Sequence, residues 1–204
     1  TAYFGPITIE NDNGCGEFMT YSLLEDNTVL EISGSGDMDD YSYSDDPDES
    51  NPPPWEQYKD TITKVVFKPE GDKINKIGTF AFAGISKLND VKMDDTITVV
   101  GESAFENCTS LTSVKIPDMT KTIEPNTFSG CTSLKTVEIP DKVITVGNSS
   151  FKNCTNLVTV DFLDPINAAS TDSKIIDESA FENCKSLVTI NCPKTTETIG
   201  AYAF

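Results

Sequence analysis

The sequence predicts a mainly β repeat solenoid of short parallel strands and helical turns, with a small β cap at its amino-terminal end. The first observation is a phenylalanine, preceded by Ala, Thr or Ser, that recurs with gaps of 23, 23, 23, 30 and 23 residues: Phe82, Phe105, Phe128, Phe151, Phe181 and Phe204. The second is that residues 1–73 contain no copy of this pattern. Because one unit of this length buries too little apolar surface to fold alone, successive units must stack and share a core.

Each unit is expected to contain a short strand followed by a second extended piece. In one complete unit, Leu111-x-x-Val114-x-Ile116 alternates apolar and polar residues, as a strand with one buried face does. Pro117 ends this strand because it has no backbone N–H to donate. Residues 121–123 form the second extended piece, which leads into a tight helical turn. The phenylalanine of that turn is expected to be the main apolar contact between neighbouring units.

Two glycines occupy one slot of the repeat, between the second extended piece and the turn. Gly101 and Gly147 both follow a valine at this point. A bend there favours a residue that can adopt a positive φ, and glycine does so without steric cost. We therefore expect positive φ at both glycines.

The complete repeat reads Ile-Gly-x-x-Ala-Phe-x-x-Cys-x-x-Leu-x-x-Val-x-Ile-Pro, with its Cys before the strand. This pattern resembles the BspA-like subfamily of leucine-rich-repeat proteins over residues 74–204. About five to six leucine-rich repeats are expected, the last one truncated at Phe204. The first unit departs from the pattern, because Ile85 follows Gly84 where Cys is expected. The resemblance implies a cell-surface solenoid that attaches to host matrix proteins or to other cells.

Residues 1–73 are expected to form a separate β cap that covers the first turn of the solenoid. Short apolar and polar stretches split by glycine-rich turns favour hairpin strands, and residues 62–67 predict a further strand that leads into the first repeat. A cap is needed because the open end of a solenoid exposes apolar edges. Between these strands, residues 42–54 are acidic and rich in proline, so we expect a disordered or mobile loop there.

The charge of the chain excludes several classes of partner. Acidic residues outnumber lysines 33 to 15, and residues 1–60 alone hold fifteen Asp or Glu against Lys59. Such a surface repels phosphate backbones and anionic lipid headgroups, so nucleic acid is not an expected partner. No apolar run approaches the length of a membrane span, so membrane insertion is not expected. The chain starts at Thr1 with neither Met nor a signal peptide, which favours a processed or trimmed chain.

The composition offers little for catalysis or for metal binding. The chain has no histidine, which removes the commonest general base and a leading transition-metal ligand. Four of the six cysteines share one slot of the repeat and are expected to form a buried ladder of thiols, while Cys15 and Cys192 remain unpaired: Cys108, Cys131, Cys154 and Cys184. No cofactor and no zinc site are expected. The acidic loop offers weak candidate calcium ligands: Asp37, Asp39, Asp40, Asp45 and Asp46.

The strand positions between the buried residues are the candidate binding site. They are expected to form two parallel rows on the concave sheet, one mainly Ser and Thr and the other running from lysine to acid: Lys92, Ser113, Lys115, Thr136, Glu138, Thr159, Asp161, Thr189 and Asn191. Ordinary solvent-facing strand composition is the more common reason for such rows. Solenoids also use such surfaces to bind proteins. The insertion within residues 164–174 is a second candidate contact.

The sequence therefore favours a non-catalytic interaction module, and three functions stay open. The first, implied by the family resemblance, is a cell-surface adhesion or protein-binding module with a host matrix or cell-surface protein as its partner. The second is a structural spacer that presents another domain. The third is a glycan hydrolase that uses paired carboxylates, since these need only spatial proximity. An extracellular or cell-surface location and a monomeric state are expected.

Overall fold

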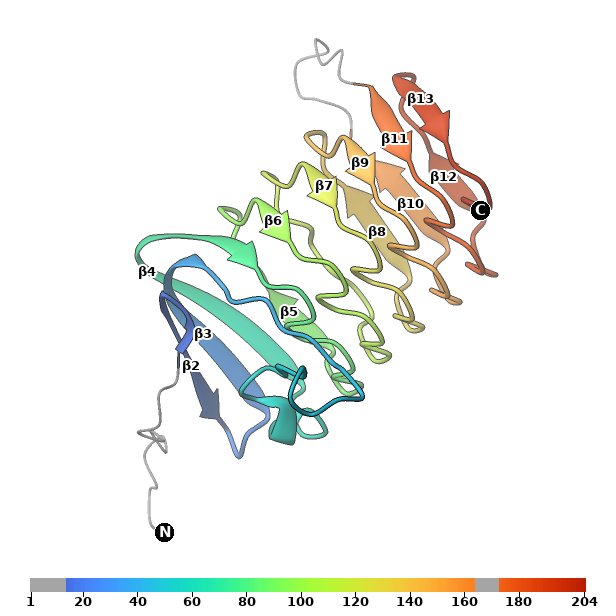
Figure 1. Ribbon diagram of the computed structural model, residues 1–204. Coiled ribbons are helices and arrows are strands. Elements are labelled where there is room, and N and C mark those ends of the chain that lie inside the picture. The colour runs from blue at the N-terminus through green and yellow to red at the C-terminus, as the bar shows by residue number, and fades with distance from the viewer. Residues whose placement is uncertain (1–13, 164–172) are drawn as a thin grey trace.

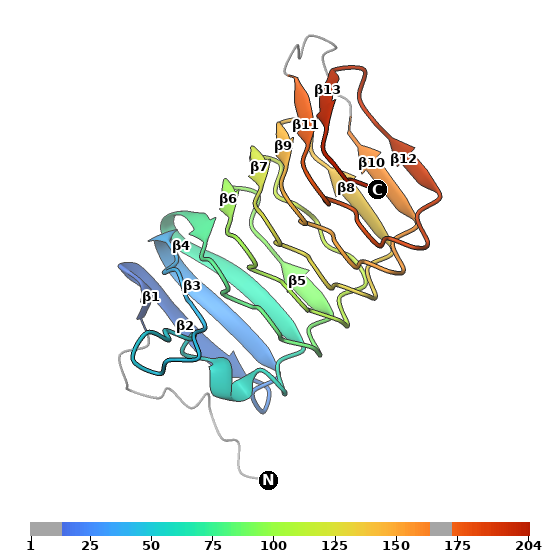
Figure 2. The same ribbon diagram turned by 45° about the vertical axis from the view of Figure 1, so that its right-hand side comes forward.

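The computed structural model describes residues 14–163 and 173–204. It is a solenoid of stacked coils with strands along two of its faces (Figures 1 and 2). The elements in chain order are β1 (Gly14–Gly16), β2 (Phe18–Leu24), β3 (Val29–Asp37), η1 (Glu56–Tyr58), β4 (Lys64–Ile77), β5 (Asp90–Lys92), β6 (Val99–Val100), β7 (Thr122–Ile123), β8 (Thr136–Ile139), β9 (Thr145–Val146), β10 (Thr159–Phe162), β11 (Lys174–Ile176), β12 (Thr189–Asn191) and β13 (Thr196–Ile199).

The strands form two sheets. The long sheet has the order β1-β2-β3-β4-β6-β7-β9-β11-β13, and β5 pairs with β4 beside this path. The short sheet has the order β12-β10-β8, and all of its pairings are parallel. Each coil after the cap thus gives one strand to the long sheet and, from β8 onward, one to the short sheet. The predicted mainly β repeat solenoid of parallel strands is confirmed.

The repeated phenylalanines form a continuous stack through the core. Ring centroids of neighbouring coils lie 5.2–5.6 Å apart with nearly parallel planes, from Phe82 to Phe204. The backbone joins the coils at the same place, since the N–H of Phe128 donates to the carbonyl of Ser150 at 2.8 Å, and the other coils repeat this bond. Each coil contributes one phenylalanine ring to the centre of the solenoid, and the contact between rings sets the distance between coils. The period of the phenylalanines in the sequence therefore predicts the stack.

The turns that carry the phenylalanines are not helices. Among the described residues the one helix is the three-residue 3₁₀ helix η1. Within each turn two residues adopt positive φ, four positions apart, for example Ser103 at 52° and Asn107 at 59°. A left-handed residue interrupts the regular helical path, so the expected helical turns become chains of tight turns. The second of these slots holds Gly or Asn in every described coil, since these residues tolerate this conformation best.

The expectation of positive φ at Gly101 and Gly147 is wrong. The positive-φ glycines of the described chain are at other positions, among them Gly84 and Gly130. The slot needs glycine because the preceding coil is too close for a side chain. A Cβ atom on Gly147 would lie 2.5 Å from the carbonyl oxygen of Ile123, and one on Gly101 would meet the backbone of the previous coil in the same way.

The cap and the solenoid share one core. Strand β4 continues across residue 73. It pairs with β3 along residues 64–69 and again at Ile74 and Lys76, and with β6 through its last two residues. The ring of Trp55 stacks on Phe82 at 5.6 Å, and its indole N–H donates to the carbonyl oxygen of Ala81 at 2.8 Å. Its neighbours Tyr21 and Tyr41 pack edge-on. The division into residues 1–73 and 74–204 stays a prediction, since no break in the packing marks it.

The acidic loop has a defined path, which differs from the expected mobile segment. Ser42 and Asn51 exchange two backbone hydrogen bonds of 2.9 and 3.0 Å, which close the loop at its base. The Tyr43 hydroxyl donates to a carboxylate oxygen of Glu56 at 2.7 Å, and the Tyr43 ring packs edge-on against Phe80. The composition of residues 42–54 alone favours disorder, but one aromatic anchor, Tyr43, holds the segment to the first coil.

The cysteine ladder is present as predicted. The thiols of Cys108, Cys131 and Cys154 are buried, and each donates to the carbonyl of the phenylalanine in the preceding coil at 3.2 Å. Cys184 continues the ladder and is half-buried. All six cysteines are free thiols. Burial, with a smaller contribution from Glu106, raises the pKa of Cys131 to about 12, so this thiol is protonated and unreactive at neutral pH.

Candidate functional site

The strands of the short sheet bring most of the predicted binding residues into two rows. We call these eight residues the polar face: Ser113, Thr136, Thr159 and Thr189 in the first row, and Lys115, Glu138, Asp161 and Asn191 in the second. The first row is in register through all four coils, and Glu138, Asp161 and Asn191 are in register through three. Six of the eight side chains are exposed, and those of Thr159 and Asp161 are half-buried.

Lys92 is the predicted binding residue that lies outside this ladder. It belongs to β5, which pairs with β4 and not with the strands of the short sheet. On that side of the solenoid ion pairs link the strands, with Lys64 and Asp90 at 2.9 Å and Lys68 and Glu31 at 2.5 Å. The rows are therefore interrupted between β5 and the coil of Ser113.

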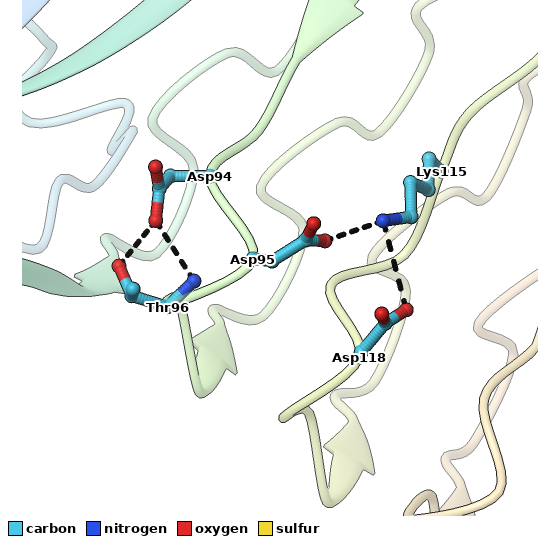
Figure 3. Close-up of polar contacts among 5 residues, drawn as sticks. All are labelled: Asp94, Asp95, Thr96, Lys115 and Asp118. Carbon is cyan, nitrogen blue, oxygen red and sulfur yellow. Dashed lines mark hydrogen bonds and ion pairs between the residues drawn. The ribbon is translucent and has the colours of Figure 1, made fainter.

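Lys115 lies at the interruption and is held by two carboxylates (Figure 3). Its ammonium is 2.6 Å from Asp95, which belongs to the preceding coil, and 3.7 Å from Asp118 in the next turn of its own coil. The hydrogen bond from Lys115 to Asp95 raises the pKa of the lysine above its usual value. Since all three side chains are well exposed, these pairs orient the lysine more than they stabilise the fold.

A turn just before Asp95 positions this carboxylate. The Asp94 side chain accepts hydrogen bonds from the backbone N–H and the hydroxyl of Thr96 at 2.8 and 2.5 Å (Figure 3). These two bonds lower the pKa of Asp94 below its ordinary value. An Asp that bonds the backbone two residues on fixes a tight turn, so Asp95 is presented toward Lys115 by local structure.

A hollow of about 330 Å³ opens beside this group. It lies between the segment of residues 113–118 and strand β8, and its lining is Ser113, Val114, Lys115, Ile116, Asp118, Thr136, Glu138, Pro140 and Leu163. Its volume is at the lower end of the range for ligand sites, enough for one side chain or a small group. Its lining contains no histidine and no cysteine.

A second hollow, of about 460 Å³, lies on the long sheet. Its lining is more apolar and includes Val99, Met119 and Lys121. Glu124 also lines it, and burial together with the charge of Glu102 raises the pKa of Glu124 above its usual value.

The structure does not bring the five candidate calcium ligands together. The carboxylate of Asp40 already has two partners. It forms an ion pair with Lys76 at 2.6 Å and accepts a hydrogen bond from the backbone N–H of Thr79 at 2.8 Å. Asp46 bonds within its own loop, to the N–H of Asp48. Over residues 14–163 and 173–204, no three His, Cys, Asp or Glu side chains are placed to hold a metal ion. The predicted contact at the insertion falls on residues 164–172, outside the described residues.

Sequence reasoning missed Asp118, which lines the hollow, and Asp95, which pairs with Lys115 beside it. The available signal was an Asp that follows the strand-ending proline in two units, Pro117-Asp118 and Pro140-Asp141. The pairing of Asp95 with Lys115 joins residues of different coils, so it depends on how far one coil is staggered against the next.

Comparison with known proteins identifies the family. The model of the BspA type leucine rich repeat region matches six copies over residues 57–173 and 165–204, so the match begins before residue 74. A leucine-rich repeat protein of T. pallidum is similar in structure, with a TM-score of 0.63, 23% identity, and coverage of 90% of this chain and 84% of that one. A leucine rich cell surface protein of Faecalibacterium prausnitzii A2-165 has a TM-score of 0.56 and 22% identity, covering 86% of this chain and 53% of that one.

These likenesses at low identity show the fold, and the family model gives the assignment. The comparison with curated proteins gives no match. Within the described ranges, no helix has the length and apolar character needed to cross a membrane. With six matched copies that cover most of its length, the chain belongs to the BspA-type leucine-rich-repeat family.

Proposed function

We propose that this protein is a non-catalytic binding module that recognises another protein through the polar face of its short sheet. The observation that carries the proposal is the pair of in-register polar rows across parallel strands, with a hollow at one end. Repeat solenoids present extended surfaces of this kind to protein partners. Family membership supports the same class of function.

The chemistry of the rows favours protein recognition. Serine and threonine hydroxyls both donate and accept hydrogen bonds, so they can pair with main-chain groups of either kind. Their side chains are short and lose little rotamer freedom on binding. The alternating strand places them on one side of the sheet, while Val137 and Val160 point into the core. A partner therefore meets a polar surface on the strands of the short sheet.

We further propose that the module acts outside the cell, on a host matrix or cell-surface protein. The support is the family resemblance and the similar structure of a protein described as a leucine rich cell surface protein. The excess of acidic residues over lysines, 33 to 15, disfavours nucleic acid as the partner.

Equilibrium binding of the purified chain to immobilised matrix and cell-surface proteins, including fibronectin and fibrinogen, tests this function. At physiological salt, saturable binding to at least one protein is expected. Flat responses across the whole panel contradict matrix adhesion and favour the spacer role. A glycan-cleaving rate that one Asp→Asn change abolishes would instead revive the hydrolase role.

A further inference from the structure

The hollow exists because the ladder of the short sheet opens at one point. In the later coils the strands pair along several residues, for example β8 with β10 from Thr136 to Ile139. The preceding coil is joined to β8 by a single bridge, between Ser113 and Thr136. Beyond that bridge, residues 114–116 lie beside β8 without forming a strand. The space between these two segments is the hollow.

The lining of the hollow has an apolar floor and an acidic rim. Val114, Ile116 and Pro140 are buried and form the floor, while Leu163 is 42% exposed. Polar groups surround them at the surface. A site with an apolar floor under a charged rim fits a side chain that has an aliphatic stem and a charged end.

The charge of the rim is negative. Lys115 is the one cation in the lining, and Asp95 and Asp118 both lie within ion-pair distance of its ammonium. Glu138 is exposed and lines the opposite wall, on β8. The lining therefore holds two carboxylates, Asp118 and Glu138, against one ammonium, which leaves a surplus of one negative charge. Glu138 has no ion-pair partner among the described residues.

We propose that the hollow receives an arginine side chain of the protein partner, with lysine as the weaker alternative. The methylene stem covers the floor formed by Ile116 and Pro140, and the guanidinium donates to Glu138 and Asp118. Arginine is preferred because its planar group can donate two parallel hydrogen bonds to one carboxylate. This inference rests on the proposed function, and it names the chemistry of the partner: an extended segment with an exposed basic residue.

The rest of the molecule supports a basic partner. The chain carries a formal net charge of −18. The cap, at one end of the solenoid, holds most of this excess, with fifteen acidic residues and one lysine in residues 1–60. A field of one sign accelerates the approach of an oppositely charged partner and weakens as salt is added. The hollow supplies the specific contact, and the cap supplies the long-range attraction.

The test uses two terminally blocked heptapeptides, Ser-Thr-Ser-Arg-Ser-Thr-Ser and the same peptide with citrulline in place of arginine. Citrulline keeps the shape of the side chain and removes its charge. Titrations followed by the NMR shifts of backbone amides locate the contact. For the arginine peptide, saturable shifts are expected at Lys115, Thr136 and Glu138, with none at Glu197 on β13. The citrulline peptide is expected to produce no saturable shift.

Two matched variants separate a specific contact from general attraction. Glu138→Gln removes a charge at the hollow, and Glu197→Gln removes one from an exposed strand residue of the long sheet. We expect Glu138→Gln to weaken binding of the arginine peptide by up to about fivefold, the upper end for an exposed ion pair, and Glu197→Gln to leave it unchanged. Equal affinities for the two peptides, or equal effects of the two variants, would overturn the proposal.

The failure of this inference is distinguishable from the failure of the proposed function. A protein partner that binds the polar face equally well with and without Glu138→Gln leaves the function standing and removes the arginine site. The opposite outcome is that no protein in the panel binds, while the arginine peptide still produces shifts at the hollow. That outcome contradicts the proposed function and supports the site for a basic side chain.

Discussion

The phenylalanine slot shows how one repeated residue determines both the core and its spacing. Phe128 stacks on Phe105 at 5.5 Å and on Phe151 at 5.3 Å, and it is fully buried. Each ring therefore has an apolar contact on both faces. Phe18 on β2 lies outside the stack and is 67% exposed. The same residue type thus contributes differently according to its place in the fold.

Truncation of the central ring is expected to destabilise the protein severely. Phe128→Ala leaves a cavity between two coils, and the free energy of unfolding should fall by about 3–5 kcal/mol. Phe18→Ala, the matched control at an exposed phenylalanine outside the stack, should reduce it by about 1 kcal/mol or less. Urea denaturation of the two variants measures the difference. Equal losses would show that the stack is not the main contact between coils.

Asp40 is expected to make stability depend on acid pH. Partial burial acts to raise its pKa, but the hydrogen bonds from Lys76 and Thr79 outweigh burial and hold the pKa below the ordinary value. A lowered pKa means that the stabilisation is present above the unfolded pKa, about 3.9, and is lost as pH falls through the folded pKa.

The variant Asp40→Asn tests this dependence. At pH 7 it should be less stable than the wild type by about 1 kcal/mol or less, because the Asp40 side chain is 52% exposed and screened by solvent. As pH falls below about 3.9 the difference should shrink, so it should be smaller at pH 2.5 than at pH 7. Urea denaturation at both pH values gives the comparison, and a difference that persists undiminished in acid would contradict the role of the ion pair.

At the scale of elements, the sequence predicts the strands and the repeat slots better than it predicts the turns. The strands follow from local alternation, so residues 136–139 and 159–162 could be anticipated from their own side chains. The conformation at Gly147 could not, because it is set by contact with the previous coil. The hollow has the same origin, since the opening of the ladder beyond Ser113 depends on pairing between coils. Residues 42–54 are a further case in which tertiary contacts decide the conformation. Their composition favours disorder, but contacts of Tyr43 with Glu56 and Phe80 order the segment.

Two glycine substitutions distinguish close approach from backbone conformation. Gly147→Ala places a methyl group 2.5 Å from a backbone carbonyl at an ordinary φ, so the coils must separate locally. We expect a loss of about 3 kcal/mol or more. Gly84→Ala has open space around the new methyl group but a φ of 73°, and should lose about 1 kcal/mol. Thermal or urea unfolding of both variants gives the order, and the reverse order would contradict the close-approach explanation.

At the scale of the whole molecule, the cap and the solenoid are joined by a continuous core and by β4. The buried apolar residues form one cluster from Cys15 to Ala203. Trp55 lies at the junction, where it contacts cap tyrosines and Phe82 of the first coil. It is the single tryptophan of the chain, so its fluorescence reports on that junction.

We therefore expect the cap and the first coils to unfold together. The loss of Trp55 fluorescence and the loss of far-UV circular dichroism should follow one transition in urea, because a break at the junction exposes the core of both parts. A Trp55 transition that clearly precedes the circular dichroism change would indicate that residues 1–73 are an independent unit.

The central claim is that the polar face of the short sheet is the protein-binding surface. The most direct test is equilibrium binding of a protein partner, found in the panel of matrix and cell-surface proteins, to two variants with the same substitution on different sheets. Thr189→Lys places a long charged side chain on exposed β12 of the short sheet, and Thr198→Lys places it on exposed β13 of the long sheet. The account predicts that Thr189→Lys weakens binding by about tenfold or more, since an unmatched charge at an interface costs more than about 1.4 kcal/mol. Thr198→Lys is predicted to leave binding unchanged. Loss of binding with Thr198→Lys and full binding with Thr189→Lys would contradict it and place the binding surface on the long sheet.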